Sequence, residues 1–308
     1  MKMGRRKFLK SIAFAGAIAT RGFSGCVSEP EPTPAPSMPT RTAPTLPATA
    51  PPAPKGIICY YSASGNTKLA CQYIANKIKS AKFDLFDIVK EKSPDLDKYA
   101  VVGLATFADF WSVPYYFCSF LEKLGPHTKK HAFVFNTYGS ASGKTLIRLK
   151  NMAEKNGFNV VAGYSLHTPE SYPPLRARGS TFDDSPDENE LEEFNEFISR
   201  FDNQLKSIQE GNAVNKEIKI SFLSRILQEL PRTQARKDMG EKYVDESLCI
   251  ECGVCKSVCP YGAIQLKPKP VFDMDKCFGC WACYNHCTEK AIYTKKYKGT
   301  SQYPKPSK

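Results

Sequence analysis

The stretch IICYYSASGNTKLACQYIANKIK, residues 57–79, joins three patterns that together specify one local structure. Residues 57–61 form a short apolar run typical of a buried β-strand, and residues 62–67 form a small polar loop around Gly65. In residues 68–79 the apolar side chains recur at helical spacing. A strand, a glycine loop and a helix in this order place backbone N–H groups around a phosphate group. No Lys-Ser/Thr pair follows the glycine, so the loop is not a Walker loop.

The alternation of strands and helices continues along the chain. Apolar runs predict further strands at 83–88, 99–105, 131–136 and 158–166, and helices at 114–124, 143–155 and 191–205. Five strands with intervening helices predict an α/β fold with a doubly wound, five-stranded parallel sheet. Such a sheet binds its ligand at the carboxyl ends of the strands.

Residues 55–208 resemble a flavodoxin, because SASGNT at 62–67 is similar to the FMN phosphate loop of that family. The resemblance implies an FMN domain in which this loop holds the phosphate and two later loops, 106–111 and 137–143, flank the flavin ring. The implied FMN-binding residues are Ser62, Ala63, Ser64, Gly65, Asn66, Thr67, Thr106, Phe107, Phe110, Trp111, Thr137, Tyr138 and Gly139. Ordinary core packing is the alternative role for each of the aromatic side chains.

Eight of the twelve cysteines fall in residues 249–287, in two runs that both read C-x2-C-x2-C-x3-C. Bacterial ferredoxins with two [4Fe–4S] clusters have this spacing, and the fourth cysteine of each run ligates the other cluster. The resemblance therefore assigns Cys249, Cys252, Cys255 and Cys287 to one cluster, and Cys259, Cys277, Cys280 and Cys283 to the second. Residues 243–296 are predicted to form a small α+β ferredoxin-like domain, built by internal duplication.

Zinc and disulfides are the alternatives for these cysteines. Structural zinc sites usually separate two CxxC pairs by a longer insert, which this spacing does not match. Disulfides are favoured only by the signs of export at the start of the chain. Cys59, Cys71 and Cys118 lie in predicted strands and helices, where we expect them to be buried apolar residues.

Residues 1–25 look like an export signal. The apolar run after the pair Arg5-Arg6 is too short to span a bilayer, and the segment resembles a twin-arginine signal, which exports folded proteins. An ordinary secretory signal is the alternative. FSGC at 23–26 resembles a lipobox, which implies a lipid at Cys26; plain cleavage nearby, leaving a free thiol, is the other reading. Residues 26–54 are rich in Pro, Thr and Ala and predict a disordered spacer.

The net charge of +12 does not indicate nucleic-acid binding, because no recognition motif accompanies it. Six of the positive charges fall in residues 1–25, and residues 209–308 carry 17 basic against 11 acidic side chains. Lys295 and Lys296, together with Lys298 in the basic tail at 297–308, are expected to guide an acidic redox partner or an anionic lipid. Residues 209–242 are predicted to be a helical linker, with apolar residues at helical spacing in 219–231.

The whole arrangement resembles a flavodoxin–ferredoxin fusion family. That resemblance implies an electron carrier with FMN, two [4Fe–4S] clusters, redox partner proteins and no catalytic side chain of its own. The signal places it outside the cytoplasm, in the periplasm or tethered by Cys26 to the outer face of the cell membrane. The alternative is an FMN-dependent reductase of a quinone, a metal or a small organic acceptor, fed by its own clusters. A redox sensor is a third, weaker hypothesis.

Overall fold

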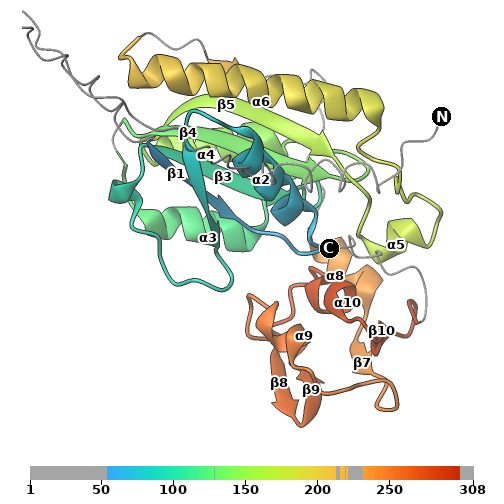
Figure 1. Ribbon diagram of the computed structural model, residues 1–308. Helices are drawn as coiled ribbons and strands as arrows, with labels where there is room; N and C mark the ends of the chain where they lie inside the picture. Colours follow the sequence, from blue (N-terminus) through green and yellow to red (C-terminus); the bar gives the residue numbers. More distant parts are fainter. Residues whose placement is uncertain (1–53, 128, 213–215, 219, 221–231, 299–308) are drawn as a thin grey trace, which may run out of the picture.

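The computed structural model describes residues 54–127, 129–212, 216–218, 220 and 232–298 (Figure 1). The predicted signal with Cys26, all of the spacer except Pro54, and residues 299–308 of the basic tail lie outside the described residues. The same holds for the apolar segment 219–231, apart from Ile220. In the described part of the chain, no helix combines the length and the apolar character needed to cross a membrane.

The N-terminal unit is built on a six-stranded, all-parallel sheet with the order β2-β1-β3-β4-β5-β6. The strands are β1 (Lys55–Tyr60), β2 (Lys82–Asp87), β3 (Val101–Phe107), β4 (His131–Tyr138), β5 (Asn159–His167) and β6 (Glu217–Ile218). The order 2-1-3-4-5 is that of flavodoxin-like doubly wound sheets. The predicted fold class is confirmed, and the structure adds β6, which pairs with Ala162 and Gly163 of β5. A two-residue strand shows no periodicity, so the sequence did not indicate it.

Two helices cover each face of this sheet. One face carries α2 (Asn66–Lys77) and α6 (Glu188–Gln209), and the other carries α3 (Tyr115–Leu124) and α4 (Thr145–Lys155). Helix α6 begins where it does because Asp187 and Glu190 form a reciprocal capping box, which satisfies the first free N–H groups. Two short helices, η1 (Leu96–Lys98) and α5 (Pro173–Arg176), lie in the connections.

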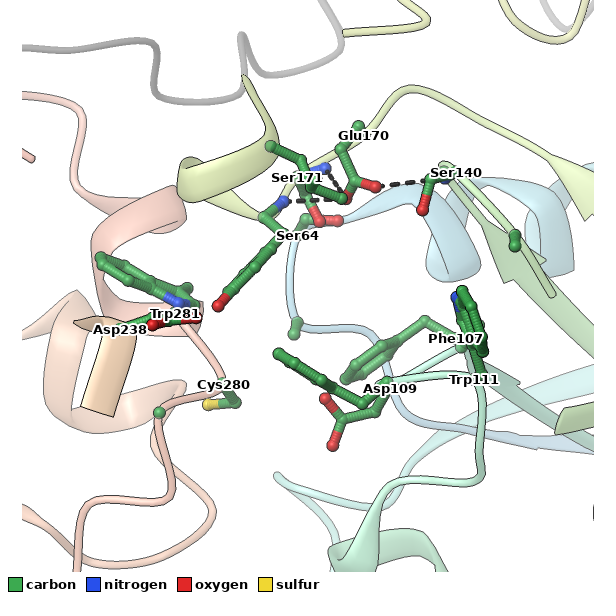
Figure 2. Close-up of a pocket in the computed structure, with 18 residues that line it drawn as sticks. Ser64, Phe107, Asp109, Trp111, Ser140, Glu170, Ser171, Asp238, Cys280 and Trp281 are labelled. Atoms are coloured by element: carbon green, nitrogen blue, oxygen red, sulfur yellow. Dashed lines mark hydrogen bonds between the residues drawn. The ribbon is translucent and has the colours of Figure 1, made fainter. Parts of the chain in front are cut away.

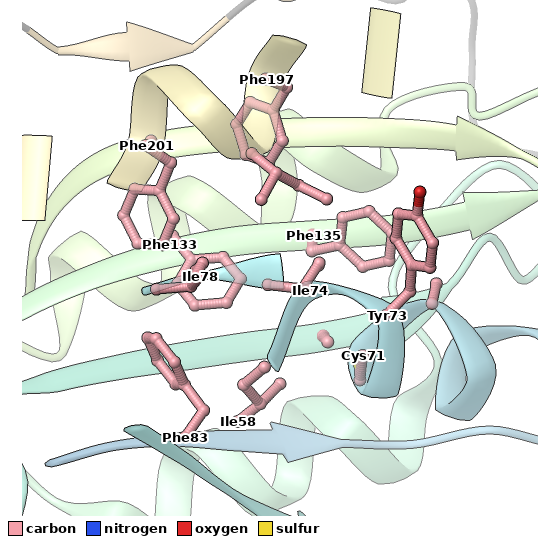
Figure 3. Close-up of a cluster of buried hydrophobic side chains, with 14 of the residues drawn as sticks. Ile58, Cys71, Tyr73, Ile74, Ile78, Phe83, Phe133, Phe135, Phe197 and Phe201 are labelled. Atoms are coloured by element: carbon pink, nitrogen blue, oxygen red, sulfur yellow. The ribbon is translucent and has the colours of Figure 1, made fainter. Parts of the chain in front are cut away.

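Aromatic side chains dominate the core between the sheet and α6 (Figure 3). The rings of Phe133 on β4 and Phe201 on α6 have their centroids 4.8 Å apart. Phe135 on β4 stacks on Phe194 of α6, with ring centroids 5.7 Å apart. Burying side chains of this size contributes about 2 to 3 kcal/mol each, so this layer anchors α6 to the sheet. The three cysteines predicted to be apolar core residues are indeed buried: Cys59, Cys71 and Cys118.

The C-terminal unit is a small α+β body of short elements. They are α8 (Arg232–Met239), β7 (Lys242–Val244), α9 (Val254–Ser257), β8 (Ile264–Lys267), β9 (Lys269–Phe272), α10 (Ala282–His286) and β10 (Ile292–Thr294). Strand β7 pairs with β10 and β8 pairs with β9, both antiparallel. The predicted linker 209–242 thus contains α8 but also the strand β6.

The C-terminal unit lies beside the carboxyl ends of the parallel strands, with α8 and α10 nearest the sheet (Figure 1). The Asn285 amide donates a hydrogen bond to the carbonyl of Ser171 at 3.0 Å, across the boundary between the units. Phe278 stacks on Tyr115, with ring centroids 6.1 Å apart. The two units therefore meet at the edge of the sheet where doubly wound folds bind their ligands.

Candidate functional site

A cavity of about 360 Å³ lies where the two units meet (Figure 2). The parallel sheet contributes the loops that follow β1, β3, β4 and β5, and the C-terminal unit contributes residues 279–281 and Asp238. Phe107 and Trp111 stand on one side of the cavity, and Cys280 and Trp281 stand opposite. The cavity therefore belongs to neither unit alone.

The loop after β1 leads into the N-terminus of α2. Gly65 has a φ of 104°, a conformation that glycine adopts without steric cost. In the described residues, no side chain caps this end of α2 and its first turn holds no acidic residue. Gly65 N donates to the hydroxyl of Ser62 at 3.1 Å, and the buried hydroxyls of Thr67 and Thr137 lie 2.9 Å apart. Free N–H groups and hydroxyls at a helix N-terminus are suited to a phosphate.

The aromatic walls of the cavity carry backbone strain. Of the seven non-glycine residues with a positive φ in the described chain, three line it: Phe110 (51°), Trp111 (66°) and Trp281 (61°). This conformation costs about 1 to 2 kcal/mol for a residue with a Cβ. Such strain persists where the surrounding packing enforces it, which happens most often at functional sites. Here it turns three large rings toward one space.

Close packing holds these loops in place. A Cβ atom at Gly143 would lie 2.1 Å from the Cβ of Trp111, and one at Gly139 would lie 2.5 Å from Oε2 of Glu170. Neither glycine can take a side chain without displacing the wall that it touches. Gly139 was one of the predicted FMN residues, and its position explains why a glycine is needed there.

Glu170 joins two of the loops. The residue is 8% exposed, and its carboxylate accepts hydrogen bonds from the backbone N–H groups of Ser140 (3.1 Å), Ser171 (2.8 Å) and Tyr172 (2.9 Å) (Figure 2). The sequence analysis missed this residue, because a lone glutamate after a strand carries no motif. The neighbouring prolines at 169, 173 and 174 were the one local sign of a fixed loop.

The predicted FMN residues fall into two groups. Six of them line the cavity: Ala63, Ser64, Phe107, Phe110, Trp111 and Gly139. The others do not line it: Ser62, Gly65, Asn66, Thr67, Thr106, Thr137 and Tyr138. Tyr138 instead stacks on His167, with ring centroids 5.1 Å apart, and the Asn66 amide donates to the carbonyl of Pro169 at 2.8 Å. The assignment of these residues to FMN stays a prediction.

The cavity has features that a flat, hydrogen-bonding ring would satisfy. The side chain of Trp281 lines the cavity, and its indole Nε1 is buried without a hydrogen-bond partner within the described structure. A buried polar group without a partner costs about 1 to 3 kcal/mol. Flat aromatic walls, the unpaired indole N–H of Trp281 and a phosphate-type loop at one edge fit FMN. Sequence reasoning did not assign Trp281 to this site, because its position follows from how the two units dock.

The first set of predicted cluster ligands comes together around one hollow. Cys249, Cys252, Cys255 and Cys287 all line it, with Ile250, Leu266 and Pro270 among the apolar residues beside them. Burial raises the pKa of Cys255 to about 11. Three of the large apolar side chains that line this hollow are exposed: Ile250, Val254 and Leu266.

The second set of predicted ligands surrounds a buried lysine. The Lys242 ammonium lies 3.2 Å from Sγ of Cys283 and 3.6 Å from Sγ of Cys277. Burial raises the pKa values of the Cys280 and Cys283 thiols, and Lys242 opposes that rise. Burying an ammonium group is costly unless a negative group accompanies it. Thiolates that carry a net negative cluster satisfy this requirement, so the residues fit a [4Fe–4S] cluster.

No group of three or more His, Cys, Asp or Glu side chains in the described residues is arranged to hold a single metal ion. The eight cysteines of the two runs are free of disulfides. At the far surface of this unit, Lys295 and Lys298 lie over the rings of Tyr243 and Tyr293, at 5.8 and 4.5 Å from the ring centroids.

Comparison with known proteins identifies this unit. Residues 242–265 match the family model for the 4Fe-4S binding domain, Fer4. The chain belongs to the 4Fe–4S ferredoxin family through this segment. In the ferredoxin domain, as we now call residues 232–298, the duplicated cysteine runs and the two short helices α9 and α10 are the matching halves.

The curated relatives match short stretches of the chain. A polyferredoxin protein, MvhB, from Methanothermus fervidus is 41% identical over 49 residues, which are 16% of this chain and 12% of that protein. Pyruvate synthase subunit PorD from Methanothermobacter marburgensis is 36% identical over 56 residues, 18% of this chain and 67% of PorD. The chain thus spans only a small part of the first of these relatives.

A solved flavodoxin from the domain Archaea is similar to the N-terminal unit. It is 19% identical, with a TM-score of 0.38, and the match covers 49% of this chain and 99% of the flavodoxin. The strand order described above establishes the flavodoxin-like fold on its own. The chain thus joins this fold to a 4Fe–4S binding domain.

Proposed function

We propose that this chain is an electron carrier that holds one FMN and two [4Fe–4S] clusters and works outside the cytoplasm, tethered to a membrane. The observation that carries the proposal is the shared cavity. Cys280, a predicted cluster ligand, lines the same space as Ser64, Phe107 and Trp111 of the flavodoxin-like unit. A flavin in that space would lie against a cysteine that holds a cluster.

The residues of the chain have separate roles in this arrangement. The N–H groups at the start of α2 and the hydroxyls of the 62–67 loop hold the FMN phosphate, and Phe107 and Trp111 pack on the ring. Cys280 and Trp281 close the cavity from the ferredoxin side. When bound, FMN exchanges two electrons in single steps and the clusters carry one electron each. Joining the two domains in one chain makes the exchange intramolecular.

The alternative is a flavin-dependent reductase of a quinone, a metal or a small organic acceptor. Such an enzyme needs open space over the flavin for its substrate. In this structure the ferredoxin domain supplies one wall of the cavity through Cys280 and Trp281, which favours a partner within the chain. We therefore prefer the carrier.

Export and tethering rest on the sequence of the first 54 residues. Export of a folded protein lets FMN and clusters be inserted in the cytoplasm, where thiols stay reduced. A lipid at Cys26 and a proline-rich spacer would hold the domains off the membrane surface, although one acyl chain alone binds weakly. Lys295, Lys296 and Lys298 would then face an acidic redox partner or anionic lipid. Cys26→Ala is expected to move the protein from the membrane to the soluble extracytoplasmic fraction; unchanged membrane association contradicts the tether.

Cofactor content tests the central proposal. Anaerobically purified protein is expected to hold about eight iron, about eight sulfide and about one FMN per chain. Zinc in place of iron, or clusters without flavin, would contradict the intramolecular carrier. Stepwise reductive titration of the loaded protein then measures whether flavin and clusters exchange electrons within one chain.

A further inference from the structure

Lys242 is the one charged side chain that is buried among the described residues of the ferredoxin domain, at 8% exposed. It sits at the start of β7 and points inward, where its ammonium group contacts the sulfur atoms of Cys283 and Cys277. It also lies 5.8 Å from the centroid of the Trp281 ring, which walls the shared cavity. Lys242 thus stands between the second set of cluster ligands and the flavin cavity.

The duplication within the domain supplies an internal comparison. Lys242 lies seven residues before Cys249, the first cysteine of its run, and Pro270 lies seven residues before Cys277, the first of the other. Pro270 is buried beside the first set of ligands, in the hollow that Cys249 lines. The two halves therefore place a cation at the second cluster and an apolar ring at the first.

Solvent exposure alone would give the second cluster a lower reduction potential than the first. Cys277 and Cys283 are 6% and 4% exposed, whereas Cys252 of the first set is exposed to water. Adding an electron makes a cluster more negative, and burial away from water disfavours that added charge. The second cluster would thus be the harder one to reduce if nothing else acted on it.

We propose that Lys242 raises the reduction potential of the second cluster, so that an electron received at the exposed first cluster moves inward to the cluster beside the flavin cavity. A fixed positive charge and N–H···S hydrogen bonds both stabilise the more negative, reduced state. The step moves one electron: the first cluster is oxidised, the second is reduced, and Lys242 keeps its proton. The inference rests on the proposed function, since it requires two bound clusters.

The test is a reductive titration of the loaded, full-length protein, followed by visible absorption and electron paramagnetic resonance. Lys242→Met removes the charge and keeps a similar volume. Pro270→Lys places a lysine at the equivalent position of the first cluster. Lys276→Met is the matched control, because Lys276 adjoins the ligand Cys277 but is 60% exposed and paired with Asp273 at 3.0 Å.

Lys242→Met is expected to lower the midpoint potential of one cluster and shift the ratio of the two reduced clusters at least tenfold, or about 59 mV for a one-electron couple. Pro270→Lys is expected to raise the potential of the other cluster, and Lys276→Met to leave both unchanged. These opposite shifts also assign the two signals without further labelling.

Three results would overturn the inference: unchanged potentials in a fully loaded Lys242→Met variant, equal shifts in Lys276→Met, or both variants acting on the same cluster. If the Lys242→Met variant does not hold its second cluster, the Pro270→Lys variant decides. A higher midpoint potential of the first cluster supports the inference, and an unchanged potential overturns it. Failure of the proposed function looks different, because the unaltered protein would then lack two clusters or FMN.

Discussion

Gly253 and Trp281 occupy equivalent positions in the two halves of the ferredoxin domain, each directly after the second cysteine of its run, and both have a left-handed backbone. Their φ angles are 71° and 61°. Glycine takes this conformation freely, whereas a tryptophan bears a cost of about 1 to 2 kcal/mol. The ring is held by Tyr284 and Tyr297, whose ring centroids lie 5.2 and 5.7 Å away. The second half thus has a cavity-lining tryptophan at the position where the first half has a glycine.

Trp281→Gly is therefore expected to relieve the backbone and still destabilise the protein. Removing a buried aromatic ring costs about 3 to 5 kcal/mol, which exceeds the relief of about 1 to 2 kcal/mol. We expect a net loss of about 1 to 4 kcal/mol in the free energy of unfolding, measured with urea, together with loss of bound FMN. Trp281→Phe keeps a ring and is expected to retain most of both. A Trp281→Gly variant as stable as the unaltered chain would show that the ring does not pack as described.

Gly65→Ala tests the phosphate loop. Nothing lies within 4 Å of a Cβ at Gly65, so the penalty comes from the φ of 104° alone and is about 1 to 2 kcal/mol. Gly211, with a φ of 73° and equally open space, ends α6 and provides the matched control. Both alanine variants are expected to lose similar stability, but only Gly65→Ala should weaken FMN binding, measured by flavin fluorescence. Equal FMN affinity in the two variants would remove this loop from the site.

Glu170→Gln tests the carboxylate that joins the loops after β4 and β5. The variant is expected to lose about 1 to 3 kcal/mol of stability, because a buried acceptor of three N–H groups becomes partly a donor. Glu91→Gln is the control: Glu91 is exposed and accepts one backbone N–H, from Asp87 at 2.9 Å. The Glu91→Gln substitution should change the free energy of unfolding by no more than about 0.5 kcal/mol. Losses of the same size in both variants would contradict the structural role of Glu170.

The pH dependence of stability has a contribution from His131, at the start of β4. Burial lowers the pKa of its imidazole, and the Asn159 amide lies 3.2 Å from Nδ1. The unfolded chain therefore takes up a proton at a higher pH than the folded chain does. Stability from this group is complete above the ordinary histidine pKa of about 6.5 and falls as the pH drops below it.

His131→Asn removes this titration. We expect the difference in unfolding free energy between the unaltered protein and the variant to shrink as the pH is lowered from about 7.5 to about 5. This range brackets the ordinary histidine pKa of about 6.5. Urea unfolding at several pH values measures it, followed by the fluorescence of the N-terminal unit. A difference that stays constant over this range would mean that His131 has the same pKa in both states.

Much of the fold could be read from the sequence because its signals are local. The apolar runs that form β1 to β5 are short and well separated, and the phosphate-type loop follows β1 directly. The cysteine spacing fixed the ferredoxin domain for the same reason. Strand β6 could not be found, since its two residues form a strand only through their pairing with Ala162 and Gly163 of β5.

The rest of the candidate site depends on contacts between distant segments. Ser171 and Asn285 are 114 residues apart in the sequence. The hydrogen bond between them joins the loop after β5 to α10. No local pattern indicates that Trp281 walls a cavity formed by loops far earlier in the chain, or that Lys242 turns inward rather than toward water. Both positions follow from docking and burial, which a single sequence does not encode in any short motif.

Because the cavity takes one wall from each domain, the order of assembly matters. A flavin that arrives before the domains dock meets an open shelf, whereas one that arrives later must wait for them to part. With the proposed flavin bound, Cys280 and Trp281 would obstruct its escape on the ferredoxin side for as long as the domains stay docked. This geometry therefore favours loading of the proposed flavin before the two domains dock.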